Sequence, residues 1–309
     1  MPPPLPPDIP WLAWWLPLLC SLIYVCGALC LKYAARYRVS LWLGSWYANV
    51  AVCCASAPLW LIPAPALSGQ PWWQAIVAGL VFWLGQFTTL VALDVGEVSI
   101  ATPVLGLKIL FVLIFMTLLS GKPPGLQLWV AGGLSLAALT LLQGAPRASA
   151  LQPNATGHKP RRIGLTILLA AFSALAYALF DVLINAWSPH WGIERIIPLA
   201  FLVALLVSTL AVGARVGSWR IPRGAIPSLC GGSALIGLQS ATLIYAIAWT
   251  QDPPRINLIY NSRGFFSILA VWGVGHWFDN HERHLGRREF IRRLCGAFLM
   301  LAAIFLAIT

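Results

Sequence analysis

Ten apolar runs divide this sequence, and they constrain its fold more than any other feature. They cover about 11–34, 41–62, 72–93, 98–119, 126–143, 164–187, 196–214, 226–249, 256–278 and 290–308. Each has about the 17–25 residues that a helix needs to span a bilayer. Groups of proline, glycine and charged residues separate them, such as Gly121-Lys-Pro-Pro-Gly125, and such groups end membrane helices. The pattern predicts an all-α integral membrane protein with ten transmembrane helices.

The composition excludes several classes of protein. Charged residues make up 9% of the chain and hydrophobic residues 59%, whereas soluble domains carry about 25% charged residues. The net charge is +11, but the cations form short clusters between apolar runs, as expected for loops beside anionic lipid headgroups. We therefore expect membrane lipids, and no nucleic acid, as partners. The seven cysteines lie in or beside apolar runs, which is typical of buried apolar residues.

The second half of the chain repeats the first. Residues 84–93 match 237–246 at an offset of 153 residues, and the offset becomes 155 before the fourth run of each half. The aligned pairs are Tyr24 with Tyr177, Gln86 with Gln239, Thr89 with Thr242, and Lys108 with Arg263. We divide the chain into a Pro-rich leader (1–10), a first five-helix repeat (11–144), a basic polar linker (145–163) and a second repeat (164–309). Because each repeat has an odd number of helices, the two copies are predicted to be inverted in the membrane.

The loops differ strongly in charge. Fifteen Lys and Arg residues follow the odd-numbered runs, and three lie in the loops on the opposite side. The positive-inside rule then places both termini outside the cytoplasm and the linker inside it. The glycosylation sequon at Asn154 would therefore remain unmodified.

Lys108 and Arg263 are cations within apolar runs. A Lys or Arg at the centre of a membrane helix costs about 2.5–3.5 kcal/mol, so two at corresponding positions suggest a use. They could clamp an anion, with Arg263 offering a planar fork and Lys108 a point charge, or they could pair with an internal acid. Asp181 is the one acid clearly inside a run, and it could be a counter-ion or carry a coupling proton. One acid cannot neutralise two cations, which leaves about one positive charge for a ligand.

Four polar residues complete the candidate substrate site. Gln86 and Gln239 lie within the third and eighth runs, where they could bind substrate or form hydrogen bonds between helices. Tyr260 and Asn261 precede Arg263 and could share a helix face with Asn257 and Gly264.

The loop 276–284 contains three histidines and two acids. These residues could assemble a metal site, but their spacing matches no metalloenzyme signature, so we expect neither a metal nor another cofactor.

The repeats resemble the drug/metabolite transporter superfamily, in particular its EamA-type members. The resemblance rests on the duplicated third and fourth runs, the Gly or Pro break between them, and Gly132-Gly133 and Gly296 near the start of each fifth run. It implies ten helices, alternating access and a central site lined by both halves.

The sequence departs from the family, which often has Gly-Glu where Gly121-Lys122 and Gly275-His276 stand and proline where Lys108 and Arg263 stand. Many EamA-type members also have both termini inside, contrary to the charge distribution here. The sugar-phosphate and nucleotide-sugar branches use basic residues in the corresponding helices.

These observations predict a secondary transporter in the cell membrane. Its substrate would be a small anionic or zwitterionic metabolite, bound centrally by Lys108 and Arg263 and moved without ATP or a covalent step. A flippase for a phosphate-linked lipid is one alternative. An integral-membrane enzyme is another, although catalysis in a membrane cavity usually needs clusters of histidines, acids or nucleophiles, and we expect all five histidines to lie in loops. The protein is therefore expected not to be an enzyme, and the sequence leaves its oligomeric state undetermined.

Overall fold

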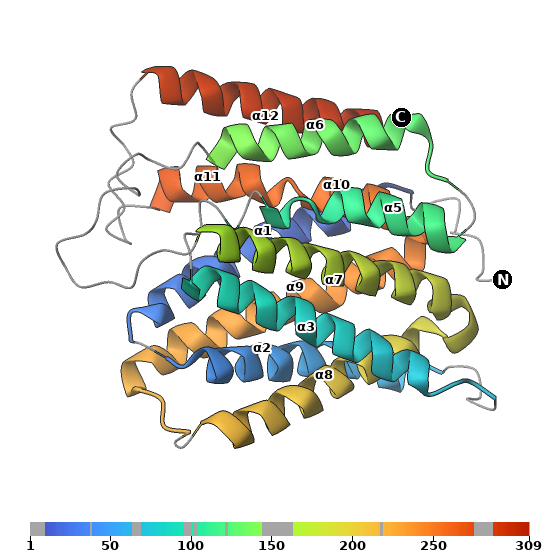
Figure 1. Cartoon of the computed structure of the whole chain (residues 1–309), viewed down its shortest axis with the longest axis vertical. Helices are drawn as coiled ribbons and strands as arrows, with labels where there is room; N and C mark the ends of the chain where they lie inside the picture. The colour runs from blue at the N-terminus through green and yellow to red at the C-terminus, as the bar shows by residue number, and fades with distance from the viewer. Residues whose placement is uncertain are drawn as a thin grey trace.

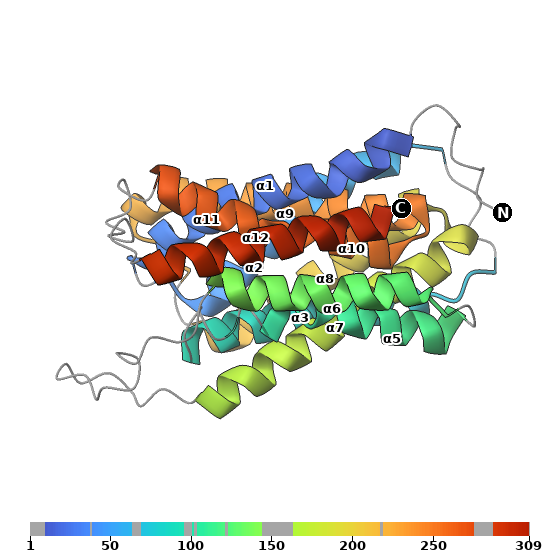
Figure 2. The same cartoon turned by 90° about the horizontal axis from the view of Figure 1, so that it is seen from above.

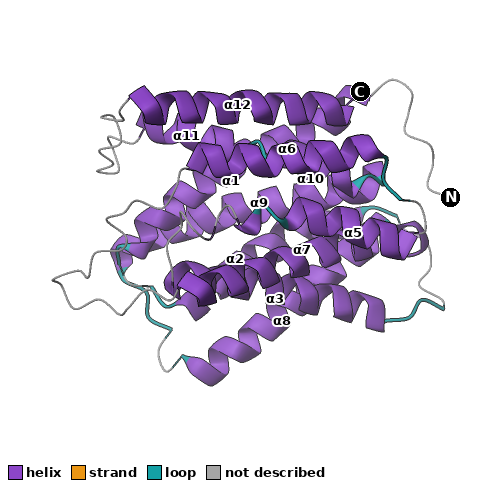
Figure 3. Cartoon of the chain, turned by 45° about the horizontal axis from the view of Figure 1, so that its top comes forward, coloured by secondary structure: helices purple, strands orange, loops and turns teal. Residues whose placement is uncertain are grey.

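The all-α prediction is confirmed for the described part of the chain. A computed structural model describes residues 10–37, 39–63, 69–95, 101, 104–120, 123–143, 163–216, 219–274 and 287–308. Within these ranges the chain forms helices joined by loops and contains no strand (Figure 3). The leader 1–9, the linker segment 145–162 and the loop 276–284 lie outside the described residues, as does the sequon at Asn154.

The main α-helices of the described part range in length from 8 to 29 residues. In chain order they are α1 (Pro10–Ala35), α2 (Leu41–Ser56), α3 (Trp73–Val95), α5 (Lys108–Ser120), α6 (Leu126–Gln143), α7 (Ile163–Trp191), α8 (Ile193–Arg215), α9 (Ile226–Thr250), α10 (Pro253–Tyr260), α11 (Arg263–Val274) and α12 (Arg287–Ile308). Six segments in the described part are long and apolar enough to cross a membrane, and they suggest a membrane protein: Trp14–Ala34, Trp73–Val95, Ile163–Trp191, Ile193–Arg215, Arg223–Thr250 and Ile291–Ile308.

Two predicted helices are interrupted. The run 256–278 was expected to be one helix, but α10 ends at Tyr260 and α11 begins at Arg263 after a two-residue turn. The run 98–119 has a turn at 106–107, and α5 begins only at Lys108. The second run also ends early as an α-helix, because its last turn, Ala57–Leu61, tightens into a 3₁₀ helix with proline in its first turn.

The connection between α9 and α10 follows from local chemistry. Gln251 takes a left-handed conformation (φ 56°) and ends α9. The carboxylate of Asp252 then caps α10 by accepting from the backbone N–H of Arg255 at 3.2 Å. Pro253 and Pro254 occupy the first turn of α10, where a missing N–H costs no helical hydrogen bond.

The helices of the two halves pack in a matching pattern. Helix α1 lies on α9 and α7 lies on α3; α2 contacts α9 and α8 contacts α3; α7 contacts α5, while α1 contacts α10 and α11. Helices α6 and α12 form a separate pair at one edge of the bundle (Figure 1). The described start of α1 and the end of α12 lie at one end of the bundle, and the end of α6 and start of α7 lie at the other (Figures 1 and 2).

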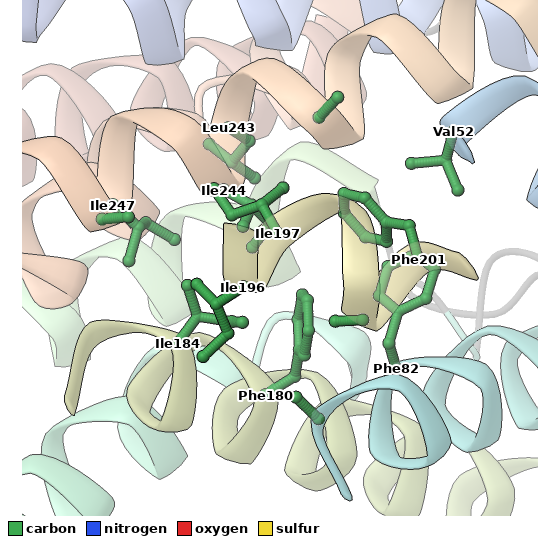
Figure 4. Close-up of a cluster of buried hydrophobic side chains, with 14 of the residues drawn as sticks. Val52, Phe82, Phe180, Ile184, Ile196, Ile197, Phe201, Leu243, Ile244 and Ile247 are labelled. Carbon is green, nitrogen blue, oxygen red and sulfur yellow. The ribbon is translucent and has the colours of Figure 1, made fainter. Parts of the chain in front are cut away.

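The main apolar core lies where α3, α7, α8 and α9 meet (Figure 4). At its centre the ring of Phe82 packs against Phe180 and Phe201, with ring centroids 5.0 and 4.9 Å apart. All three side chains are buried. Aromatic pairs at these distances contribute about 0.5–1.5 kcal/mol beyond the burial of their area. This core holds α3 and α7 in place, and both helices line the site described below.

Gly237 lets the backbones of α9 and α2 approach closely, and we expect Gly237→Ala to destabilise the protein. A Cβ at this position would lie 2.5 Å from the backbone carbon of Ala51, so the helices must separate. Overpacking of this kind costs about 1–3 kcal/mol. Thermal unfolding in detergent should show a lower midpoint for Gly237→Ala than for the wild type.

Gly231→Ala is the matched control, because Gly231 lies on the same helix with no atom within 4 Å of an added Cβ. Its midpoint should be unchanged or slightly higher, since Ala favours a helix over Gly by about 0.5–1 kcal/mol. Equal midpoints for the two variants would contradict the predicted close contact.

Candidate functional site

A cavity of about 120 Å³ lies between the two halves of the chain. This volume holds several water molecules or a small ligand. The cavity is lined by Tyr24, Phe82, Thr89, Leu105, Lys108, Ala174, Tyr177, Phe180, Asp181, Ile236, Gln239, Ser240, Leu243, Ile244, Tyr260 and Arg263. Lys108 and Arg263 therefore face the same space, although 155 residues separate them in the sequence.

Each cation is the first residue of a helix that follows a break. In the first half, Leu107 N donates to Val104 O at 3.0 Å and Ile109 N to Gly106 O at 3.4 Å. In the second half, Ser262 N donates to Ile259 O at 3.0 Å and Gly264 N to Asn261 O at 3.1 Å. The two hydrogen bonds of the first half thus correspond to the two of the second half, donor to donor and acceptor to acceptor, at the offset of 155. The two helices thus break in the same way, and the cation after each break lines the cavity.

A neighbouring helix satisfies polar groups at the second break. Ser21 of α1 donates to the carbonyl oxygen of Tyr260 at 3.0 Å and accepts from the hydroxyl of Ser262 at 3.1 Å. An interrupted helix is tolerated in an apolar medium when adjacent serine side chains supply such partners.

Lys108 forms a buried ion pair. Its Nζ lies 2.7 Å from Asp181 Oδ2, and the Lys and Asp side chains are 14% and 1% exposed. Asn257 of α10 donates to the same oxygen at 2.6 Å. Asp181 Oδ1 and Asn257 Oδ1 are buried without a hydrogen-bond partner among the described residues. The pair joins α5, α7 and α10, and Asp181 is the counter-ion of Lys108 rather than of Arg263.

Arg263 faces aromatic rings instead of an acid. Its guanidinium carbon lies 4.9 Å from the ring centroid of Tyr24 and 4.7 Å from that of Tyr260. Its Nη1 donates to the hydroxyl of Tyr260 at 3.2 Å. No Asp or Glu in the described part of the chain forms an ion pair with it. A cation at the first residue of a helix also meets the positive end of the helix dipole, so Arg263 keeps a largely uncompensated charge.

The two cations have related aromatic partners but differ in charge balance. Lys108 Nζ lies 5.7 Å from the ring centroid of Tyr177, which aligns with Tyr24 at the offset of 153. The position equivalent to Asp181 in the first half is Ala28, which carries no charge. The acid that neutralises Lys108 thus has no counterpart beside Arg263.

The cavity does not include two of the predicted substrate residues. Gln86 accepts hydrogen bonds from Ser45 (3.2 Å) and Asn49 (2.5 Å) of α2, so it links α2 to α3. Asn261 donates to Ser135 of α6 at 3.1 Å, away from the cavity lining. Both side chains hold helices together in this conformation.

The cavity also includes residues that the sequence did not single out as ligands. Tyr24 and Tyr177 were found as an aligned pair, and their repetition was the signal that could have identified them. Thr89 carried the same signal, since it aligns with Thr242. Ser240 follows Gln239 and had no distinguishing pattern. The arrangement as a whole combines one uncompensated guanidinium, three phenol rings and a neutral ion pair, which suits the binding of an anion.

We expect Lys108→Met to destabilise the protein strongly, because it leaves the Asp181 carboxylate buried without a cation. Breaking a buried pair in this way costs about 3–5 kcal/mol, and the double variant Lys108→Met/Asp181→Asn should recover most of the loss. Thermal unfolding in detergent measures both.

The control is Arg255→Met, which breaks the more exposed pair of Arg255 with Asp252, where the side chains are 39% and 26% exposed. That loss should be far smaller, since exposed pairs contribute about 0–1 kcal/mol. A double variant less stable than Lys108→Met would contradict the expected coupling.

The comparisons with known proteins give the fold and no activity. No family model matches the chain, and no curated protein matches it. Solved structures do match: one, described only as "Crystal structure of protein", has a TM-score of 0.71 and 17% sequence identity, with 96% of each chain covered. At this identity the similarity concerns the fold alone.

Proposed function

We propose that this protein is a secondary transporter that moves a small anionic or zwitterionic metabolite by alternating access. The observation that carries the proposal is Arg263, a cation without an acidic partner in the described part of the chain, which lines a cavity between two repeated halves. Arg263 is half-buried, and a charge removed from water without an opposite charge beside it is costly. Such a cost is readily understood if a ligand supplies the opposite charge.

The packing of the helices supports an inverted repeat, with units at 11–144 and 164–309. If α1 corresponds to α7, α2 to α8 and α3 to α9, the contact of α1 with α9 corresponds to that of α7 with α3. The contact of α2 with α9 likewise corresponds to that of α8 with α3. The matching breaks before Lys108 and Arg263 extend this correspondence to single hydrogen bonds. Inverted repeats with broken helices place substrate at the interface of the repeats, where this cavity lies.

The proposal takes the ten apolar runs as ten membrane crossings, in the manner of the EamA-type transporters that the sequence resembles. In that arrangement α10 and α11 together form one crossing, and α5 completes another. Each break lies inside its crossing, so both cations reach the cavity from within the bundle. Rocking of one half against the other would expose the same site to either side of the membrane.

Anion binding is the first property to measure. We expect purified protein in detergent to be stabilised against thermal unfolding by some phosphate- or carboxylate-bearing metabolites in a panel that also holds amines and neutral sugars. A ligand at 100 times its dissociation constant adds about 2.7 kcal/mol to stability. Arg263→Gln should weaken binding at least about tenfold, because a hydrogen bond to a charged group contributes about 1.5–3 kcal/mol. Uptake of the same ligand into liposomes containing the protein should fall in parallel.

Arg223→Gln is the matched control, since Arg223 is an exposed arginine in the short helix Arg223–Ala225 and is not among the residues that line the cavity. It should bind and transport as the wild type does. Stabilisation by amines or neutral compounds that Arg263→Gln leaves unchanged would contradict an anion site. Product formation from a bound compound in detergent, without a membrane to cross, would favour an enzyme instead.

The proposed orientation can be tested separately. In a variant without its native cysteines, a cysteine introduced in the linker 145–162 should react with a membrane-impermeant maleimide only after the cells are permeabilised. The charge distribution requires this result, because it places the linker in the cytoplasm. Labelling of intact cells would mean that the orientation is the opposite of the one proposed, and it would leave the proposed anion site untouched.

A further inference from the structure

The charges that line the cavity have a definite sum. Lys108 and Asp181 are joined at 2.7 Å, and their charges cancel. This holds whether the proton lies on the amine or on the carboxylate, because both arrangements of the pair are neutral overall. Among the described residues of the lining, the other charged one is Arg263, and the rest are uncharged aromatic, aliphatic, hydroxyl and amide side chains. The lining therefore carries a net charge of one positive unit.

From this sum we propose that the site selects a monoanion, and that Asp181 sets this selectivity by neutralising Lys108. The inference rests on the proposed function and names its substrate class. A monoanion on Arg263 makes the cavity neutral. A dianion would leave one negative charge in a cavity lined mainly by aromatic and aliphatic side chains, where an uncompensated charge costs more than at a surface. Without Asp181, the same cavity would present two cations and suit a dianion.

The geometry around Arg263 agrees with one anionic group. Its guanidinium makes one hydrogen bond within the described residues, from Nη1 to Tyr260, so other N–H groups remain for a two-pronged contact. The rings of Tyr24 and Tyr260 lie against it and favour an apolar or planar body next to the anion. A carboxylate or a monoester of sulfuric acid has this chemistry, as does a phosphodiester. A phosphate monoester, which is largely doubly charged at neutral pH, does not.

The test compares two probe anions of similar size, methyl sulfate with one charge and sulfate with two, at equal ionic strength. Thermal unfolding gives an apparent affinity for each probe in four proteins that differ only at Lys108, Asp181 and Arg263. Subtracting the response of Arg263→Gln removes general salt effects from every measurement. The wild type should prefer methyl sulfate about tenfold or more. Asp181→Asn, with a lining charge raised by one, should prefer sulfate.

The double variant Lys108→Gln/Asp181→Asn supplies the decisive control, because it removes both members of the pair and keeps the lining charge of the wild type. It should again prefer methyl sulfate, whereas Asp181→Asn should prefer sulfate. A pair with a purely structural role would give both variants the same preference. If Asp181→Asn does not fold, the double variant still tests whether a lining charge of one positive unit prefers the monoanion, since it leaves no charge unpaired at positions 108 and 181.

The outcomes separate this inference from the proposed function. If neither probe gives a response that depends on Arg263, the anion site itself is wrong. If the probes bind through Arg263 but the wild type prefers sulfate, or the double variant does, the anion site stands and the charge selection is overturned. A preference for methyl sulfate in both proteins, with a preference for sulfate in Asp181→Asn, supports the selection of a monoanion by charge balance. A preference for methyl sulfate in Asp181→Asn as well overturns the role of Asp181.

Discussion

The ion pair of Lys108 with Asp181 is the interaction on which the interior depends. Transferring either charge alone out of water would cost several kcal/mol, and the pair is tolerable because the two groups meet at 2.7 Å with Asn257 as a further donor. These three residues belong to α5, α7 and α10, so one polar contact aligns elements from both halves of the chain. It also decides which cation remains free. With Lys108 neutralised, the electrostatics of the cavity are those of Arg263.

The near-symmetry of the chain makes this difference informative. Tyr24 and Tyr177 occupy aligned positions. The ring of Tyr24 lies beside Arg263 of the second half, and the ring of Tyr177 lies beside Lys108 of the first half. The symmetry fails at one position, where the second half has Asp181 and the first has Ala28. A duplicated architecture can thus hold a site of unequal halves. One half provides a neutral polar wall and the other provides the charge that a ligand would meet, as function generally resides in a site rather than in a fold.

The broken helices explain how cations reach the interior at an acceptable cost. A cation within a continuous membrane helix would have only that helix and its neighbours to compensate it. At a break, the chain turns between Tyr260 and Arg263, and the side chain projects into a cavity lined by tyrosines rather than toward lipid. The contacts of Arg263 with Tyr24 and Tyr260 supply cation–π attraction of about 0.5–2 kcal/mol each, which offsets part of its desolvation. The hydroxyl of Ser21 stabilises the break itself.

The sequence by itself determined the helical class and the approximate position of the long helices, because apolar length is a local property that does not depend on packing. It also predicted a duplication, from repeated residues at a fixed offset. It also drew attention to Lys108, Arg263 and Asp181, since charges are conspicuous within apolar runs. The breaks at 106–107 and 261–262 were missed, because two turn residues are too few to end an apolar run. Only the tertiary structure decided that Asp181 pairs with Lys108, that Gln239 lines the cavity while Gln86 binds α2, and that Asn261 contacts α6. These outcomes depend on distances between side chains far apart in the chain, and those distances are set by how the helices pack.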